Sequence, residues 1–243
     1  MISFEQRVDA IRREGAALAA SARTAGVDAR VPSCPDWTVA DLLGHIGRIQ
    51  RWVAAIITDQ RKERGVHWSE AAPPPNDELL DWFAASPGLL AGALAHAGPD
   101  VELWSWTPDR SSAFWARRQA VETAIHRYDA QLAAGEVAPV EHGLALDGID
   151  ELFWLLPYWP WAERVRGNGE TIHFHCTDGH GEWLVRLAPE GVEVTRGHAQ
   201  GDVAARGTAS DLLLSLYGRV PVDRLDVFGT AELLSHWRDL VNW

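Results

Sequence analysis

The sequence predicts a multidomain protein, in which an all-α four-helix bundle over residues 1–140 is followed by a small α+β domain over residues 141–243. Three observations lead to this prediction. The first 140 residues contain four segments with apolar residues at helical spacing. After Pro139 the pattern changes, and apolar and polar residues alternate between glycine-containing turns. The length of 243 residues also suits one large domain or two small ones.

The first expected helix covers residues 2–24 and carries an apolar stripe that suits a bundle. The stripe consists of Phe4, Val8, Ile11 and Leu18. Gly15 fills the position between the last two, and a glycine there weakens a helix by about 1 kcal/mol relative to alanine. It would also let a neighbouring helix approach closely.

Three further helices are expected, at residues 38–59, 76–97 and 111–135. Thr38 and Asp41 resemble a capping box at the start of the first of them. Pro87 is expected to kink or split the second. The segment 60–75, which ends in three prolines, is expected to be a loop.

The C-terminal domain is expected to combine helices with a meander of short strands. Strands are expected at residues 171–175, 183–187, 192–194, 202–206 and 225–228, and helices at residues 144–157, 208–218 and 230–241. His173 and His175 share one strand face and, with His180, form a candidate metal site. No carboxylate or cysteine lies in line with them, so a solvated strand face is the favoured interpretation.

Composition limits the possible partners and the cellular setting. The net charge of −12 argues against nucleic-acid binding, which needs a basic surface. No apolar run approaches the roughly 18 residues that would span a bilayer, so we expect no membrane insertion. Two distant cysteines are not a disulfide framework, and charged residues throughout the first 20 positions do not fit a signal peptide. A cytoplasmic protein, monomeric or a small homo-oligomer, is therefore expected.

The fourth expected helix carries the first candidate for chemistry. Glu122 and His126 are four residues apart, which places them on one helix face with Cβ atoms about 5–6 Å apart. A carboxylate and an imidazole at that distance can share a metal ion, although a surface ion pair or a helix-end histidine is the commoner explanation. His45, near the start of the second helix, faces inward and is a satisfied core residue in most such cases. Cys34 is either a nucleophile or, more commonly, a buried structural thiol.

Three segments together carry a resemblance to a known family. They are Pro32 to Thr38 leading to Asp41–His45, Phe114–Arg118 leading to Glu122 and His126–Asp129, and Gly207–Leu214 leading to Gly218–Arg219. They occur in the order found in the mycothiol-dependent maleylpyruvate isomerase family, which the chain resembles over nearly its whole length. The resemblance implies a DinB-like metal-binding bundle and a sterol-carrier-like C-terminal domain. One departure is Asp36, where the family motif usually has glycine.

The resemblance also implies a set of site residues. His45, Glu122 and His126 correspond to the two histidines and one glutamate that bind the family's divalent metal. Two imidazoles and a carboxylate suit zinc best, and nickel and iron are the alternatives. Arg219 corresponds more loosely to an arginine that holds substrate carboxylate, and Arg118 is a second candidate for that catalytic role. Asp129 is a candidate acceptor for the second N–H of a metal-bound histidine, with a helix-surface charge as the alternative.

The chemistry that follows from the resemblance is thiol-dependent. Mycothiol would serve as the thiol cosubstrate, and its thiolate would attack a small electrophilic substrate, which can carry a carboxylate. The enzyme would be an isomerase or a thiol transferase. Two other classes fit the same residues. One is a metal-dependent hydrolase with the same three ligands. The other is a non-catalytic protein that binds a small ligand and uses the metal structurally.

Overall fold

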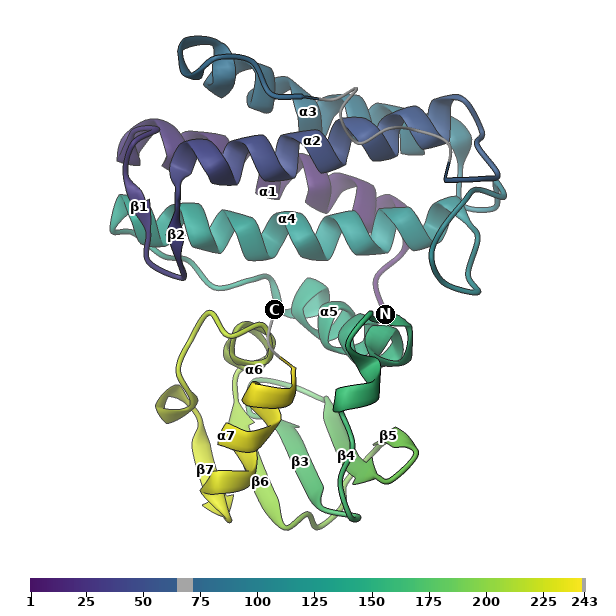
Figure 1. Cartoon of the computed structure of the whole chain (residues 1–243), viewed down its shortest axis with the longest axis vertical. Helices are drawn as coiled ribbons and strands as arrows, with labels where there is room; N and C mark the ends of the chain where they lie inside the picture. The colour runs from purple at the N-terminus through teal and green to yellow at the C-terminus, as the bar shows by residue number, and fades with distance from the viewer. Residues whose placement is uncertain (65–71, 242–243) are drawn as a thin grey trace. The chain divides into compact units, whose positions relative to one another are not determined.

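The computed structural model describes residues 1–64 and 72–241 (Figure 1). The chain forms two compact units, Met1–Ala138 and Pro139–Trp243. The first unit is the expected helix bundle, and the second combines helices with a sheet. Part of the expected loop at 60–75, residues 65–71, lies outside the described residues. No helix in the described ranges combines the length and apolar character needed to cross a membrane.

The described residues of the first unit form four long helices that run side by side, together with a short β-hairpin (Figure 1). The helices are α1 (Phe4–Ala25), α2 (Val39–Thr58), α3 (Asn76–Ala97) and α4 (Ser112–Ala134), and the hairpin strands are β1 (Arg30–Val31) and β2 (Cys34–Thr38). The hairpin is antiparallel and leads directly into α2.

The ends of these helices follow from local sequence signals. The expected capping box at α2 is confirmed, because the Thr38 hydroxyl accepts from the backbone N–H of Asp41 and the Asp41 carboxylate accepts from that of Thr38. The Ser111 hydroxyl caps α4 by accepting from the backbone N–H of Phe114. Gly135 ends α4 in the left-handed conformation, with φ of 79°, which glycine adopts without steric cost.

Two glycines allow the helices to pack closely. A Cβ on Gly15 of α1 would lie 2.3 Å from Cγ of Pro87 in α3, so the expected close approach at Gly15 is present. A Cβ on Gly47 of α2 would lie 2.4 Å from the Trp82 ring. Helix α3 is unbroken across Pro87, which rules out the split that was one expected alternative. The apolar stripe of α1 is buried at Val8, Ile11 and Leu18, as expected.

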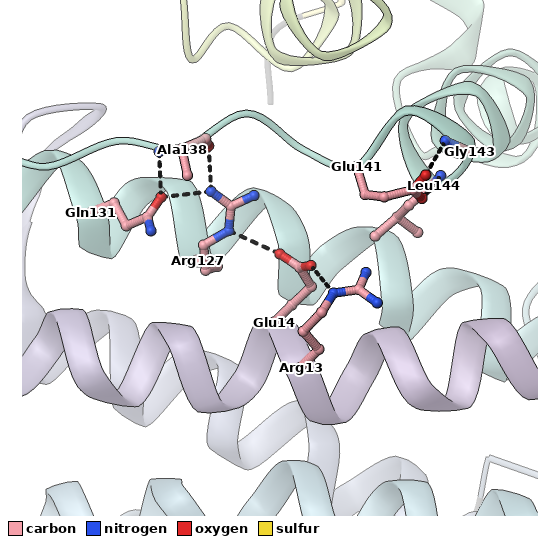
Figure 2. A network of polar contacts seen from close by, with 8 residues as sticks. All are labelled: Arg13, Glu14, Arg127, Gln131, Ala138, Glu141, Gly143 and Leu144. Carbon is pink, nitrogen blue, oxygen red and sulfur yellow. Dashed lines mark hydrogen bonds and ion pairs between the residues drawn. The ribbon is translucent and has the colours of Figure 1, made fainter.

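A buried polar network joins α1 and α4 (Figure 2). Nε of Arg127 donates to Oε2 of Glu14 over 2.9 Å, and both side chains are almost fully buried. Arg127 also donates to the side chain of Gln131 and to the carbonyl of Ala138, while Arg13 donates to the other oxygen of Glu14. The buried charges of Arg127 and Glu14 therefore both have partners. A folded protein tolerates buried charges when they are paired in this way.

The second unit contains a mixed five-stranded sheet in the order β5-β4-β3-β6-β7. Its strands are β3 (Thr171–Cys176), β4 (Glu182–Ala188), β5 (Gly191–Arg196), β6 (Val203–Gly207) and β7 (Asp226–Gly229). Its helices are α5 (His142–Leu155), α6 (Ala209–Leu216) and α7 (Ala231–Leu240), with short 3-10 turns at Leu156–Tyr158, Ala162–Arg164 and Val222–Arg224. The Glu141 carboxylate caps α5 by accepting from the backbone N–H groups of Gly143 and Leu144 (Figure 2).

The two faces of this sheet differ in character. On one face, the ring of Phe174 in β3 contacts Phe153 of α5 and Trp237 of α7, which forms the core beneath the helices. The alternate β3 residues His173 and His175 point to the opposite face. His173 is nevertheless buried, at 5% exposure, so the expectation of a solvated strand face is wrong for this residue.

Candidate metal centre

Two helices of the bundle bring together the three residues considered as metal ligands. His45 lies on α2, and Glu122 and His126 lie one turn apart on α4. Each offers one ligand atom, and these atoms all lie within 4.8 Å of one another. The Nε2 atom of His45 is 3.8 Å from Oε1 of Glu122, and the two imidazole rings are 5.1 Å apart, edge to face. The geometry therefore presents two imidazoles and one carboxylate to a common point.

The imidazole of His126 contacts a carboxylate on its own helix, α4. Its Nδ1 lies 2.9 Å from Oδ2 of Asp129, one turn further along the helix. Asp129 is fully buried, and its other oxygen accepts from the hydroxyl of Ser33 over 2.6 Å. Asp129 therefore contacts a histidine of the candidate ligand set, and the alternative of a helix-surface charge is wrong. A proton on Nδ1 of His126, donated to this carboxylate, leaves the Nε2 lone pair for a metal.

Glu122 is held in its ionised form by its surroundings. Burial acts to raise its pKa, but His45 and then the charges of Arg118 and His126 outweigh this and lower the pKa of Glu122 to about 2. Its Oε2 accepts from the Gln119 amide over 3.1 Å and lies 3.7 Å from Nε of Arg118. These contacts direct one carboxylate oxygen along α4 and leave Oε1 on the side of His45.

Three neighbours of the centre were not identified from the sequence as site residues: Trp37, Gln119 and Ser33. The Trp37 ring lies 4.9 Å from that of His45 and stacks at 6.3 Å over that of His126. Gln119 donates to the Glu122 carboxylate, and Ser33 donates to the Asp129 carboxylate behind His126. Gln119 precedes Glu122 by three residues, so helical spacing alone would have identified it. Trp37 and Ser33 lie in the β1–β2 hairpin. No local sequence pattern predicts that this hairpin packs against α4.

Both units of the chain match models of one protein family. The model described as the mycothiol maleylpyruvate isomerase N-terminal domain matches residues 8–131, and the MDMPI C-terminal domain matches residues 143–236. The chain belongs to the mycothiol maleylpyruvate isomerase family. No curated protein sequence matches the chain significantly.

Solved structures support the fold of this family. The chain resembles the crystal structure of the mycothiol-dependent maleylpyruvate isomerase with a TM-score of 0.64 and 13% sequence identity, over 93% of each chain. A histidine-to-alanine mutant of that isomerase gives the same TM-score, with 12% identity over 93% of each chain. At this identity the likeness establishes a shared two-part fold, a helix bundle followed by an α+β unit.

The donor set at the centre of the isomerase-family bundle fits a divalent metal of the zinc type. Two imidazoles and a carboxylate are ligands that zinc takes in catalytic sites, where three protein ligands leave one position open. The second N–H of His126 already has an acceptor, as metal-bound histidines usually require. The residues present therefore suit the divalent metal that the resemblance implied.

The two arginines named as candidate catalytic residues occupy different parts of the family fold. Arg118 is buried on α4, one turn before Glu122. Arg219 belongs to the second unit, where it follows Gly218 after the end of α6. It is partly buried, and its Nη1 donates to the carbonyl of Tyr217 over 2.8 Å.

Proposed function

We propose that this chain is a metal-dependent enzyme that uses a low-molecular-weight thiol, mycothiol, to isomerise or S-conjugate a small electrophilic substrate in the cytoplasm. One observation carries the proposal: His45, Glu122 and His126 present their ligand atoms within 4.8 Å of one another, in the domain that matches the mycothiol maleylpyruvate isomerase model. We assign His45, Glu122 and His126 as the metal ligands, with zinc as the preferred metal.

The chemistry that the metal supplies when bound is a positive charge that lowers the pKa of a coordinated thiol, so that thiolate is available at neutral pH. A free thiol is only a few per cent thiolate at that pH. The chain's residues prepare this centre. Asp129 fixes the tautomer and orientation of His126, and Gln119 and Arg118 orient the Glu122 carboxylate.

In the isomerisation, the thiolate sulfur forms a bond to one carbon of a cis double bond, and the electron pair of that bond moves to the substrate's conjugated carbonyl group. The remaining single bond rotates. Elimination then breaks the C–S bond, returns the thiolate and leaves the trans double bond. In a transferase, protonation of the adduct gives a thioether that leaves the enzyme. We assign to Arg219, and secondarily to Arg118, the binding of substrate carboxylate.

Hydrolysis is less well supported by the same residues. A hydrolase needs a base that takes a proton from water at the centre. The Asp129 carboxylate contacts the ligand His126, but it is already occupied by His126 and Ser33. A metal lowers the pKa of a coordinated thiol enough for its proton to pass to solvent, so thiol chemistry needs no such base.

The test measures turnover with and without thiol. Metal-loaded protein is incubated with maleylpyruvate and a panel of small electrophiles, with mycothiol present or omitted. The expected result is turnover of at least one substrate that requires both metal and thiol. His126→Ala should lose metal and activity together, whereas His96→Ala, at an exposed position on α3, should change neither. Turnover that is equally fast without any thiol would identify a hydrolase and contradict the proposal.

A further inference from the structure

A second cluster of ligand-type side chains lies in the C-terminal unit, on the sheet face opposite the helices. It consists of His173 and His175 on β3, Glu182 on β4 and His198 in the segment after β5. β3 and β4 are adjacent and antiparallel (Figure 1), and their register places His175 directly opposite Glu182. The ligand atoms of the four residues all lie within 4.8 Å of one another.

The three imidazoles converge on a single oxygen. Oε2 of Glu182 lies 3.1 Å from Nε2 of His173, 3.4 Å from Nδ1 of His175 and 2.8 Å from Nδ1 of His198. One carboxylate oxygen offers about two lone pairs, so it cannot accept three N–H groups equally well. Four ligands about 2.0–2.1 Å from a tetrahedral zinc ion would lie roughly 3.3 Å from one another. The observed nitrogen–oxygen separations are close to that spacing.

The histidines of the cluster differ in exposure. The side chain of His173 is only 6% exposed. His198, in contrast, has a side chain that is 82% exposed, and its Nδ1 nevertheless lies 2.8 Å from Oε2 of Glu182.

We propose that His173, His175, Glu182 and His198 form a second metal site, which takes zinc or a similar divalent transition metal. Three imidazoles and one carboxylate are donors that this class of ion accepts. All four positions of a tetrahedron are filled by protein atoms, which is the arrangement of a structural site rather than of a catalytic one. The site is independent of the centre in the helix bundle and does not rest on the proposed function.

The structural consequence is a link between the segment after β5 and two interior strands of the sheet. His198 lies in the segment between β5 and β6, and the other three ligands lie on the adjacent strands β3 and β4. A shared ion would tie this segment to the two strands. Because an ion that binds only the folded state stabilises it by mass action, zinc should raise the melting temperature of the protein.

The experiment removes the bundle centre first and then tests the second site alone. In the His126→Ala background, Zn²⁺ is titrated against a chromophoric chelator, and Co²⁺ absorption reports tetrahedral geometry. The expected result is one equivalent of tightly bound metal per chain. Adding His198→Ala should weaken this binding by more than about tenfold, since loss of even a secondary partner of a metal ligand costs about that much. His198 is exposed, so its replacement should not disturb folding.

The matched control is His180→Ala, which removes an exposed histidine of the same unit that is not part of the cluster. It should leave the stoichiometry and the zinc-dependent rise in melting temperature unchanged. Glu182→Gln provides a second variant that should lose both. The proposal is overturned if the His126→Ala protein binds no zinc, or if it binds zinc equally well with and without His198.

Discussion

Nδ1 of His126 lies 2.9 Å from Oδ2 of Asp129, a carboxylate that is fully buried one turn away on the same helix. This contact decides which imidazole nitrogen faces the candidate metal centre. The hydroxyl of Ser33 holds the second oxygen of Asp129, so the carboxylate cannot rotate freely. The orientation of His126 therefore depends on the β1–β2 hairpin as well as on α4.

Replacing Asp129 with alanine should lower metal affinity at the bundle centre by about 10- to 100-fold, because the partner that orients a ligand imidazole is lost. The affinity is measured by competition with a chelator. Asp36→Ala is the control, since Asp36 is an exposed aspartate in the same hairpin as Ser33. An unchanged affinity in the Asp129 variant would show that the contact does not orient the ligand.

Replacing Glu14 with alanine should destabilise the protein by about 3–5 kcal/mol, because it removes the buried carboxylate that pairs with Arg127 (Figure 2). The free energy of unfolding is measured by urea denaturation. The control is Asp9→Ala in the exposed pair between Asp9 and Arg12, which should cost about 0–1 kcal/mol. Equal effects of the two replacements would contradict the importance assigned to the buried pair.

The features that the sequence predicted well are those with local causes. Helix starts at Thr38 and Ser111 follow from side chains that cap backbone groups within three residues. The juxtaposition of Glu122 and His126 follows from helical spacing alone. Adding His45 required the family resemblance, because no local rule says which residue of α2 faces α4.

The features that the sequence did not predict depend on pairing between distant segments. Glu182 joins His173 and His175 only because the β3–β4 register sets it opposite His175, and a slip of one residue would move it to the other face. The parallel pairing of β3 with β6 is likewise a property of the sheet as a whole.

Replacing Gly15 with alanine should destabilise the bundle by about 1–3 kcal/mol, because the new Cβ would overlap the rigid ring of Pro87. This loss should exceed the gain of about 1 kcal/mol in helix propensity. The control is Gly92→Ala on α3, where a Cβ meets nothing within 4 Å and the propensity gain should stabilise the protein. Thermal unfolding of the two variants should shift in opposite directions; stabilisation by both would refute the close contact.

The thiol of Cys176 should be inert in the folded protein. Burial, followed by the nearby Asp178 carboxylate, raises the pKa of Cys176 to about 12, so almost no thiolate exists at about pH 8. In a Cys34→Ser variant, which leaves Cys176 as the remaining thiol, a chromogenic disulfide reagent should react only after denaturant is added. Rapid reaction of the native variant would contradict the assigned environment.

The same shift in Cys176 predicts how stability depends on pH. The folded pKa lies above the ordinary thiol value of about 8.5, so the folded state keeps a proton that the unfolded state loses. The contribution of protonated Cys176 to the free energy of unfolding is therefore fully present below about pH 8.5 and is lost as the pH rises towards 12. Urea denaturation at several pH values between these limits measures this loss. Replacing Cys176 with alanine should make the decline of the free energy of unfolding with pH shallower, whereas Cys34→Ser should leave the contribution of Cys176 in place. Equal slopes of this free energy against pH in the two variants would exclude Cys176 as the source of the decline.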